Sequence, residues 1–263
     1  MNILFLGDIV GQIGIRAVSE ALPSLKQKEG IDFVIANGEN ASRGKGLVYR
    51  DYRDLCEAGI DCITLGNHYL GKKQINSFID EANNLIRPIN VRGYHKGEGS
   101  RLFLVGGIPV RVTNVLGQVF MTEEVEDPIP TIRHLLDSVE PTIHIVDFHA
   151  EATSEKQAIA RYFDGRITAL LGTHTHCQTA DARVLAKGTG LITDVGFCGA
   201  YESILGDEPE DSIRRFFLHD HSVSLHVPES GPTLISGVVV SVDTETKHCA
   251  KIKPLYLYEG GPA

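Results

Sequence analysis

Residues 169–176 read ALLGTHTH, a short apolar run that ends in glycine, threonine and two histidines. The same arrangement occurs at four earlier positions, where a β-prone apolar run stops at a small group of Asp, Glu, Asn or His. Ligands of an open α/β sheet bind beyond the carboxyl ends of its strands, so the five clusters are expected to converge on one cleft. The clusters are Gly7-Asp8, Asn37-Gly38-Glu39-Asn40, Gly66-Asn67-His68, Asp147-Phe148-His149 and Gly172-Thr173-His174-Thr175-His176.

Apolar runs and amphipathic stretches alternate along most of the chain, an order that is typical of a largely parallel sheet covered by helices on both faces. The expected strands are residues 3–6, 33–36, 62–65, 110–115, 143–148, 169–171 and 191–193. The expected helices are residues 15–28, 49–58, 73–82, 129–139, 155–163 and 210–218. Two later β-rich segments, 234–242 and 250–258, are expected to pair antiparallel at the sheet edge or to form a second sheet.

The overall composition limits the classes of partner. With 25 basic and 34 acidic residues the formal net charge is −9, which disfavours broad binding to nucleic-acid backbones. No apolar stretch approaches the roughly 20 residues that a membrane helix needs, and no signal peptide is visible. The five cysteines form no CxxC pair and are expected to be reduced thiols. We therefore expect a cytoplasmic protein of one domain, residues 1–263, and leave a homo-oligomer open.

Each polar cluster taken alone has a plainer interpretation. Asp8 could cap a helix or form a turn, and His149 could be a hydrogen-bonded histidine of the core. His174 and His176 are the stronger pair, because alternate residues of an extended segment point the same way. It is a poor explanation that five unrelated polar clusters arose by chance at five predicted strand ends. The sequence therefore predicts a shared metal site.

Seven side chains make up the candidate ligand set: Asp8, Glu39, Asn40, Asn67, His149, His174 and His176. This mixture of nitrogen and oxygen donors suits iron, manganese or zinc better than calcium or a structural Cys₄ zinc site. Seven donors are too many for one tetrahedral ion, but they suit two ions that lie about 3.5–4 Å apart and share a carboxylate. We expect two divalent or trivalent ions, with iron placed first and manganese or zinc as alternatives.

The motifs that carry these residues resemble a known family. They follow the metallophosphoesterase order of blocks GD, G(D/N/E), GNH, H and GHxH, and they are most similar to the YmdB family of bacterial phosphodiesterases. The matching stretches are GDIVG (7–11), NGENASRGKG (37–46), GNH (66–68), DFHAEATSEK (147–156), GTHTHCQTAD (172–181) and ITDVGFCGAY (192–201). The resemblance spans nearly the whole chain. It implies a calcineurin-like α/β sandwich, two mixed sheets flanked by helices, with a di-metal centre.

The resemblance also implies a role for each candidate residue. One ion would be held by Asp8, Glu39, Asn40 and His176, and the other by Glu39, Asn67, His149 and His174. Glu39 would bridge the two ions, and His68 would stand outside the metal shell as a proton donor.

Three positions depart from the patterns of the relatives. Val10 stands where the first block of the broad superfamily has a histidine, and Asn40 is the natural substitute ligand. Glu39 replaces the usual bridging aspartate. Within the narrower family, Tyr69-Leu70 follow GNH in place of Thr-Trp-Asp, so substrate preference could differ.

The candidate metal ligands predict an enzyme that hydrolyses a small phosphodiester. The resemblance implies that its substrates are 2′,3′- or 3′,5′-cyclic nucleotides. A metal-bridging hydroxide would attack phosphorus, and His68 would protonate the departing oxygen. Arg43 and Lys45 follow Glu39 in a glycine-bearing loop and are candidates to place the anionic substrate, with exposed loop charges as an equal alternative. The alternative functions are a phosphomonoesterase on the same fold and a metal-bound cyclic-nucleotide sensor with little turnover.

Overall fold

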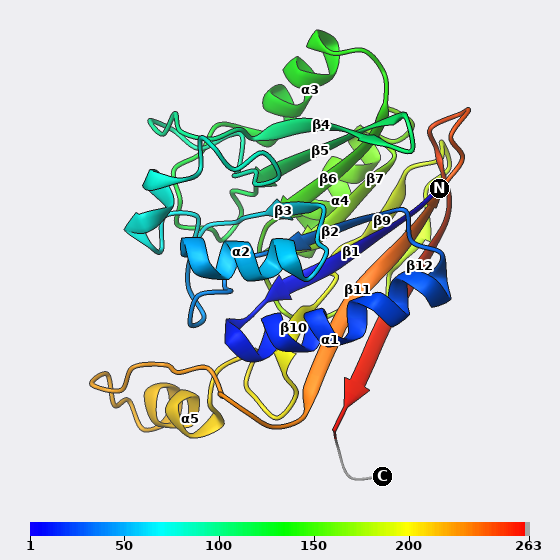
Figure 1. The fold of residues 1–263 in the computed structure, drawn as a ribbon. Helices are drawn as coiled ribbons and strands as arrows, with labels where there is room; N and C mark the ends of the chain where they lie inside the picture. The colour runs from blue at the N-terminus through cyan, green and yellow to red at the C-terminus, as the bar shows by residue number, and fades with distance from the viewer. Residues whose placement is uncertain (261–263) are drawn as a thin grey trace.

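The computed structural model describes residues 1–260 and contains two six-stranded mixed sheets (Figure 1). Sheet 1 contains β1 (Asn2–Ile9), β2 (Phe33–Asn37), β3 (Cys62–Thr64), β10 (Phe197–Ala200), β11 (Thr233–Val242) and β12 (Cys249–Glu259), in the order β12-β11-β10-β1-β2-β3. Sheet 2 contains β4 (Ser100–Val105), β5 (Ile108–Leu116), β6 (Ile143–His149), β7 (Ala169–Thr173), β8 (Arg183–Val184) and β9 (Gly190–Ile192), in the order β4-β5-β6-β7-β9-β8. The helices are α1 (Gly11–Glu29), α2 (Tyr49–Glu57), α3 (Pro128–Ser138), α4 (Thr153–Tyr162) and α5 (Pro209–Phe217).

Strand β1 contributes side chains to two layers of the hydrophobic core. Ile3 and Phe5 pack between the sheets with residues of β6 and β7, whereas Leu4 and Leu6 pack with α1 on the outer face of sheet 1. All four side chains are fully buried, as the period-two geometry of a strand covered on both faces requires. A third core cluster joins α3 and α4 to the outer face of sheet 2. The predicted sandwich of two mixed sheets flanked by helices is confirmed.

The central strands of both sheets run parallel. In sheet 1, β2 pairs parallel with β1 and with β3; in sheet 2, β5, β6, β7 and β9 form a continuous parallel set. The carboxyl ends within each sheet therefore lie at one edge, and those edges carry the polar clusters named above.

The two late β segments are paired as predicted. β11 pairs antiparallel with β12, which forms the edge of sheet 1, and β11 also pairs antiparallel with β1. Strands β4, β8 and β10 were not predicted. β8 has only two residues, and β10 (FCGA) contains a glycine, so neither carries a clear strand pattern.

The expected helix over residues 73–82 is wrong. The segment forms only a short 3-10 helix, Lys73–Ser77, and then a series of turns. Side chains here bond to nearby backbone, because Asn76 Nδ2 donates to the Lys73 carbonyl at 3.1 Å and Ser77 Oγ to the Gln74 carbonyl at 2.7 Å. Such local bonds compete with the helical ladder and favour turns.

Two further expectations concern cysteine and membranes. All five cysteines are free thiols, as predicted. Within residues 1–260, no helix combines the length and apolar character that crossing a bilayer requires.

Phe5 tests the core between the sheets. We expect Phe5→Ala to lower the free energy of unfolding by about 3–5 kcal/mol, because it leaves a cavity in a fully buried position. Phe217, 76% exposed on α5, is the matched control, and Phe217→Ala should change the free energy of unfolding by less than about 0.5 kcal/mol. Urea unfolding monitored by circular dichroism compares the two, and equal effects would contradict the assignment of Phe5 to the core.

Candidate metal centre

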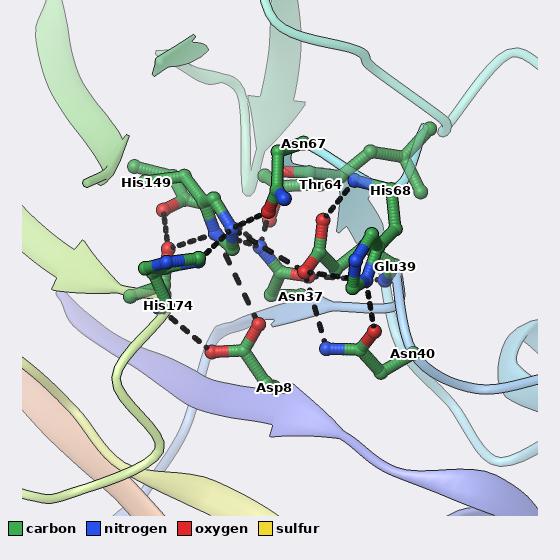
Figure 2. Close-up of polar contacts among 12 residues, drawn as sticks. Asp8, Asn37, Glu39, Asn40, Thr64, Asn67, His68, His149 and His174 are labelled. Atoms are coloured by element: carbon green, nitrogen blue, oxygen red, sulfur yellow. Dashed lines mark hydrogen bonds and ion pairs between the residues drawn. The ribbon is translucent and has the colours of Figure 1, made fainter. Parts of the chain in front are cut away.

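Five strands from both sheets deliver the candidate ligands to one place (Figure 2). β1 ends just beyond Asp8, β2 leads into Glu39, and β3 leads into Asn67, all from sheet 1. From sheet 2, β6 ends at His149 and β7 leads into His174. The structure therefore brings the five sequence clusters together, but at the meeting of two sheets rather than along the edge of one.

His149 lies at the centre of the group and is fully buried. Its Nδ1 lies 2.8 Å from Thr173 Oγ1, and that hydroxyl donates to the carboxylate of Asp147 at 2.7 Å. The hydroxyl must therefore accept from His149 Nδ1–H, which fixes the tautomer and leaves the Nε2 electron pair unprotonated in the neutral ring. That electron pair faces two oxygens, Asn67 Oδ1 at 2.9 Å and Glu39 Oε1 at 3.3 Å.

The other two imidazoles are held in the same way. His174 Nε2 lies 3.3 Å from the carboxylate of Glu151, so Nδ1 is left to face His149 Nε2 at 3.1 Å. His176 Nδ1 lies 2.7 Å from the Leu205 carbonyl, so Nε2 is left to face Asn40 Nδ2 at 3.2 Å and Asp8 Oδ1 at 3.9 Å. In each ring the outer nitrogen has an acceptor. The inner nitrogens of His149 and His176 turn toward carboxylates, and that of His174 turns toward His149.

The two central carboxylates are buried, and one oxygen of Asp8 is left unpaired. Asp8 is fully buried; its Oδ2 accepts from the His174 backbone N–H at 3.2 Å, while Oδ1 has no hydrogen-bond partner within residues 1–260. Burial raises the pKa of Asp8, despite the attraction of His176 and His149. Burial also opposes ionisation of Glu39, but His149 and His68 outweigh it and lower the pKa of Glu39 to about 2.

The donor set fits bound cations. Burial alone would lower the pKa of His149, but Glu39 and Asp8 raise it to about 9, so the group draws a positive charge to its centre. Glu39, His149 and His174 each place a ligand atom within 4.8 Å of the others. A Cβ at Gly66 would collide with the Glu39 carboxylate and the His149 ring, so glycine is required for this approach. Cations would satisfy the facing electron pairs and the unpaired oxygen of Asp8 together.

Asn67 and Asn40 join the group through their amides. Asn67 donates through Nδ2 to Glu123 Oε1 at 3.2 Å, which turns Oδ1 toward His149. Asn40 donates through Nδ2 to Glu39 Oε1 at 3.1 Å, which turns Oδ1 toward His68 Nδ1 at 2.8 Å. A carbonyl oxygen has two electron pairs, so the Asn40 contact with His68 leaves one free for a cation.

His174 and His176 converge for a different reason from the one predicted. β7 ends at Thr173, and the two histidines lie in a turn with φ angles of 103° and 62° rather than on an extended segment. The turn in the left-handed region, not strand alternation, directs both rings to the site.

The two basic loop residues take separate positions. A pocket of about 220 Å³ beside the ligands is lined by Val10, Glu39, Asn40, Gly44, His68, His174, Thr175, His176, Leu205 and Asp207. Arg43 lines a neighbouring cleft instead, together with Arg16 and Arg50. Lys45 is close enough to His68 for its charge to lower the pKa of that ring, after the larger effect of burial.

Sequence reasoning did not select the residues that orient the ligands. Asn37, labelled in Figure 2, accepts from the Glu39 backbone N–H at 3.0 Å and donates to Asp147 at 3.2 Å. Burial raises the pKa of Asp147 to about 7. Asp147 lies two residues before His149 on β6, so its position on the same face of the strand was the available signal.

Comparison with known proteins places these features in a family. The family described as YmdB-like protein matches residues 4–255. A 2′,3′-cyclic-nucleotide 2′-phosphodiesterase of Bacillus subtilis (strain 168) is 45% identical over 98% of this chain and 97% of its own length.

Two solved structures share the fold closely. A hypothetical protein from Thermus thermophilus has a TM-score of 0.92 and 39% identity, covering 98% of this chain and 100% of its own. A novel phosphatase from Mycoplasma pneumoniae has a TM-score of 0.93 and 37% identity, covering 100% of this chain and 95% of its own. The fold, the order of the motifs and the match over residues 4–255 agree, and the chain belongs to the YmdB-like family of the metallophosphoesterase fold.

Proposed function

We propose that this chain is a metal-dependent phosphodiesterase that hydrolyses small phosphodiesters, foremost 2′,3′- or 3′,5′-cyclic nucleotides. One observation carries the proposal: three imidazoles, each held by its outer nitrogen, turn their inner nitrogens into one cluster with two buried carboxylates. The likeness to a 2′,3′-cyclic-nucleotide 2′-phosphodiesterase supports the reaction type. The five free thiols support the cytoplasm as its compartment.

The proposed ligands fall into two groups that share Glu39. One cation would be held by Asp8, Glu39, Asn40 and His176, and the other by Glu39, Asn67, His149 and His174. When bound, two such ions neutralise phosphoryl oxygens and lower the pKa of coordinated water. The mixed nitrogen and oxygen donors suit iron first, with manganese or zinc as alternatives.

His68 is the proposed proton donor. Its Nδ1–H donates to Asn40 Oδ1, an oxygen that can only accept, so Nε2 is the nitrogen that can carry the transferable proton. Burial lowers the pKa of His68, so a nearby phosphate anion is needed to favour the protonated ring. The protonated Nε2 then gives its proton to the departing alkoxide oxygen, which leaves as a neutral hydroxyl.

The pocket and the charge of the chain both favour small substrates. A volume of about 220 Å³ admits a phosphate with its nearest substituents. The net charge of −9 repels long polyanions, whereas bound cations reverse the sign locally at the site. Lys45, whose charge reaches His68, is the residue that we propose steers the anion, whereas Arg43 lines the neighbouring cleft.

A substrate panel with metal analysis tests the reaction class. We expect the purified protein to contain close to two transition-metal ions per chain and to hydrolyse cyclic nucleotides and aryl phosphodiesters faster than aryl phosphomonoesters. Preference for monoesters would make it a phosphomonoesterase. Binding of cyclic nucleotide without product would make it a sensor.

His68→Ala tests the proton donor. We expect metal content to stay unchanged while kcat falls about 10²–10⁴-fold on an alkyl phosphodiester, whose leaving group needs the proton. The loss should be smaller on an aryl diester with a good leaving group. His95 is exposed and serves as the control, since His95→Ala should retain wild-type rates. Full activity of His68→Ala on the alkyl diester would overturn the assignment.

The substitution Glu39→Gln tests whether Glu39 is shared by the two cations, because it keeps the shape of the side chain and removes its negative charge. We expect metal affinity to fall by more than the roughly 10–100-fold typical of a change outside the ligand shell. In metal-free protein, the pKa of His149 should also drop from about 9, because Glu39 contributes most to raising it against burial. Elemental analysis and histidine NMR titration measure the two effects, with Glu57→Gln on the surface as control. Unchanged metal content would refute the bridging role.

A further inference from the structure

A lysine lies fully buried directly behind the turn that carries His174 and His176. Lys156, on α4, donates from Nζ to the Thr173 carbonyl at 2.7 Å and to Asp194 Oδ2 at 2.9 Å. Neither Lys156 nor Asp194 has any exposed surface. The pair is therefore a buried ion pair, and both of the Lys156 contacts are with segments that border the metal centre.

Asp194 holds the same turn at a second point. Its Oδ2 accepts from the Thr175 backbone N–H at 3.0 Å, and its Oδ1 accepts from the Gly196 backbone N–H at 2.9 Å. Thr175 lies between the two histidines, and Thr173 lies just before them. The ion pair thus binds the backbone at residues 173 and 175, alternating with the residues whose side chains enter the site.

The turn needs such support because its backbone is strained. His174 and His176 both adopt positive φ angles, 103° and 62°, which non-glycine residues rarely adopt without surrounding constraint. Gly172 allows the close packing beneath, because a Cβ there would collide with the Thr193 carbonyl and approach the Lys156 side chain. The bonds at residues 173 and 175 fix the backbone on both sides of His174 and on the N-terminal side of His176.

We propose that Lys156 and Asp194 are positioning residues, which hold the 173–176 turn so that His174 and His176 present their inner nitrogens to bound cations. An apolar side chain of similar volume could fill the position of Lys156 without the cost of burying a charge. An apolar side chain cannot donate a hydrogen bond to the Thr173 carbonyl or provide a counter-charge for Asp194. The proposal rests on the metal-dependent function proposed above.

The test uses two variants and a matched control. Lys156→Met removes the donor but leaves Asp194 buried without its counter-charge, so this variant could fail to fold. The double variant Lys156→Met/Asp194→Asn removes both charges and avoids that outcome. Ile159→Ala, a buried apolar position one turn further along α4, is the control for loss of packing.

The first measurement is amide hydrogen exchange over residues 172–178 in metal-free protein. We expect exchange at the Thr175 amide to become at least about tenfold faster in the double variant than in the control. An amide at position 194 has one acceptor oxygen for the Thr175 and Gly196 N–H groups, and it is no longer held by Lys156. The second measurement is the affinity for Mn²⁺ alone by calorimetry, which should weaken roughly 10–100-fold in the double variant and remain near the wild-type value in Ile159→Ala.

The two measurements separate the possible failures. Exchange and Mn²⁺ affinity that match the control would overturn the positioning role. If wild-type protein binds no Mn²⁺, iron or zinc, the proposed function fails, yet the exchange experiment still shows whether the pair holds the turn. Faster exchange with unchanged Mn²⁺ affinity would show that the pair stabilises the turn without serving the site, which also overturns the proposal.

Discussion

The crowding of electron-rich atoms around His149 is the constraint on which the rest of the structure depends. Two buried carboxylates and the inner nitrogens of three imidazoles face one another without enough protons to satisfy them. Burying such a group costs several kcal/mol unless positive charge is present. Bound cations would supply that charge, and the stability of the arrangement would then be linked to their binding.

The surrounding residues keep that crowding in place. Each ring is fixed through its outer nitrogen, His149 by Thr173, His174 by Glu151 and His176 by the Leu205 carbonyl. The asparagine amides are turned by carboxylates in the same manner. These hydrogen-bond partners determine which atom of each side chain faces the centre. Residues that do not contact a metal can orient its ligands in this way.

The two-sheet architecture explains why the site can be both rigid and open. Glu39 and Asp8 come from sheet 1, whereas His149 and the 173–176 turn come from sheet 2. The apolar core between the sheets, to which Ile3 and Phe5 belong, fixes their separation and with it the distance between carboxylates and imidazoles. His68 lies at the rim, half-buried, where it can reach both Asn40 and the pocket.

The sequence alone determined the class of fold and which candidate residues were expected to meet at one place. Apolar runs that end in Asp8, Glu39, Asn67 and His149 are local signals, because strand propensity and the polar residue that follows are properties of a few neighbouring positions. Tertiary structure decided the rest. The meeting of two sheets, the left-handed turn at His174, and the buried partners of Lys156 depend on contacts between residues far apart in the chain. A single sequence read by local pattern does not specify such long-range packing. The helix expected over residues 73–82 gave way to turns for a local reason, because Asn76 and Ser77 bond to nearby backbone carbonyls.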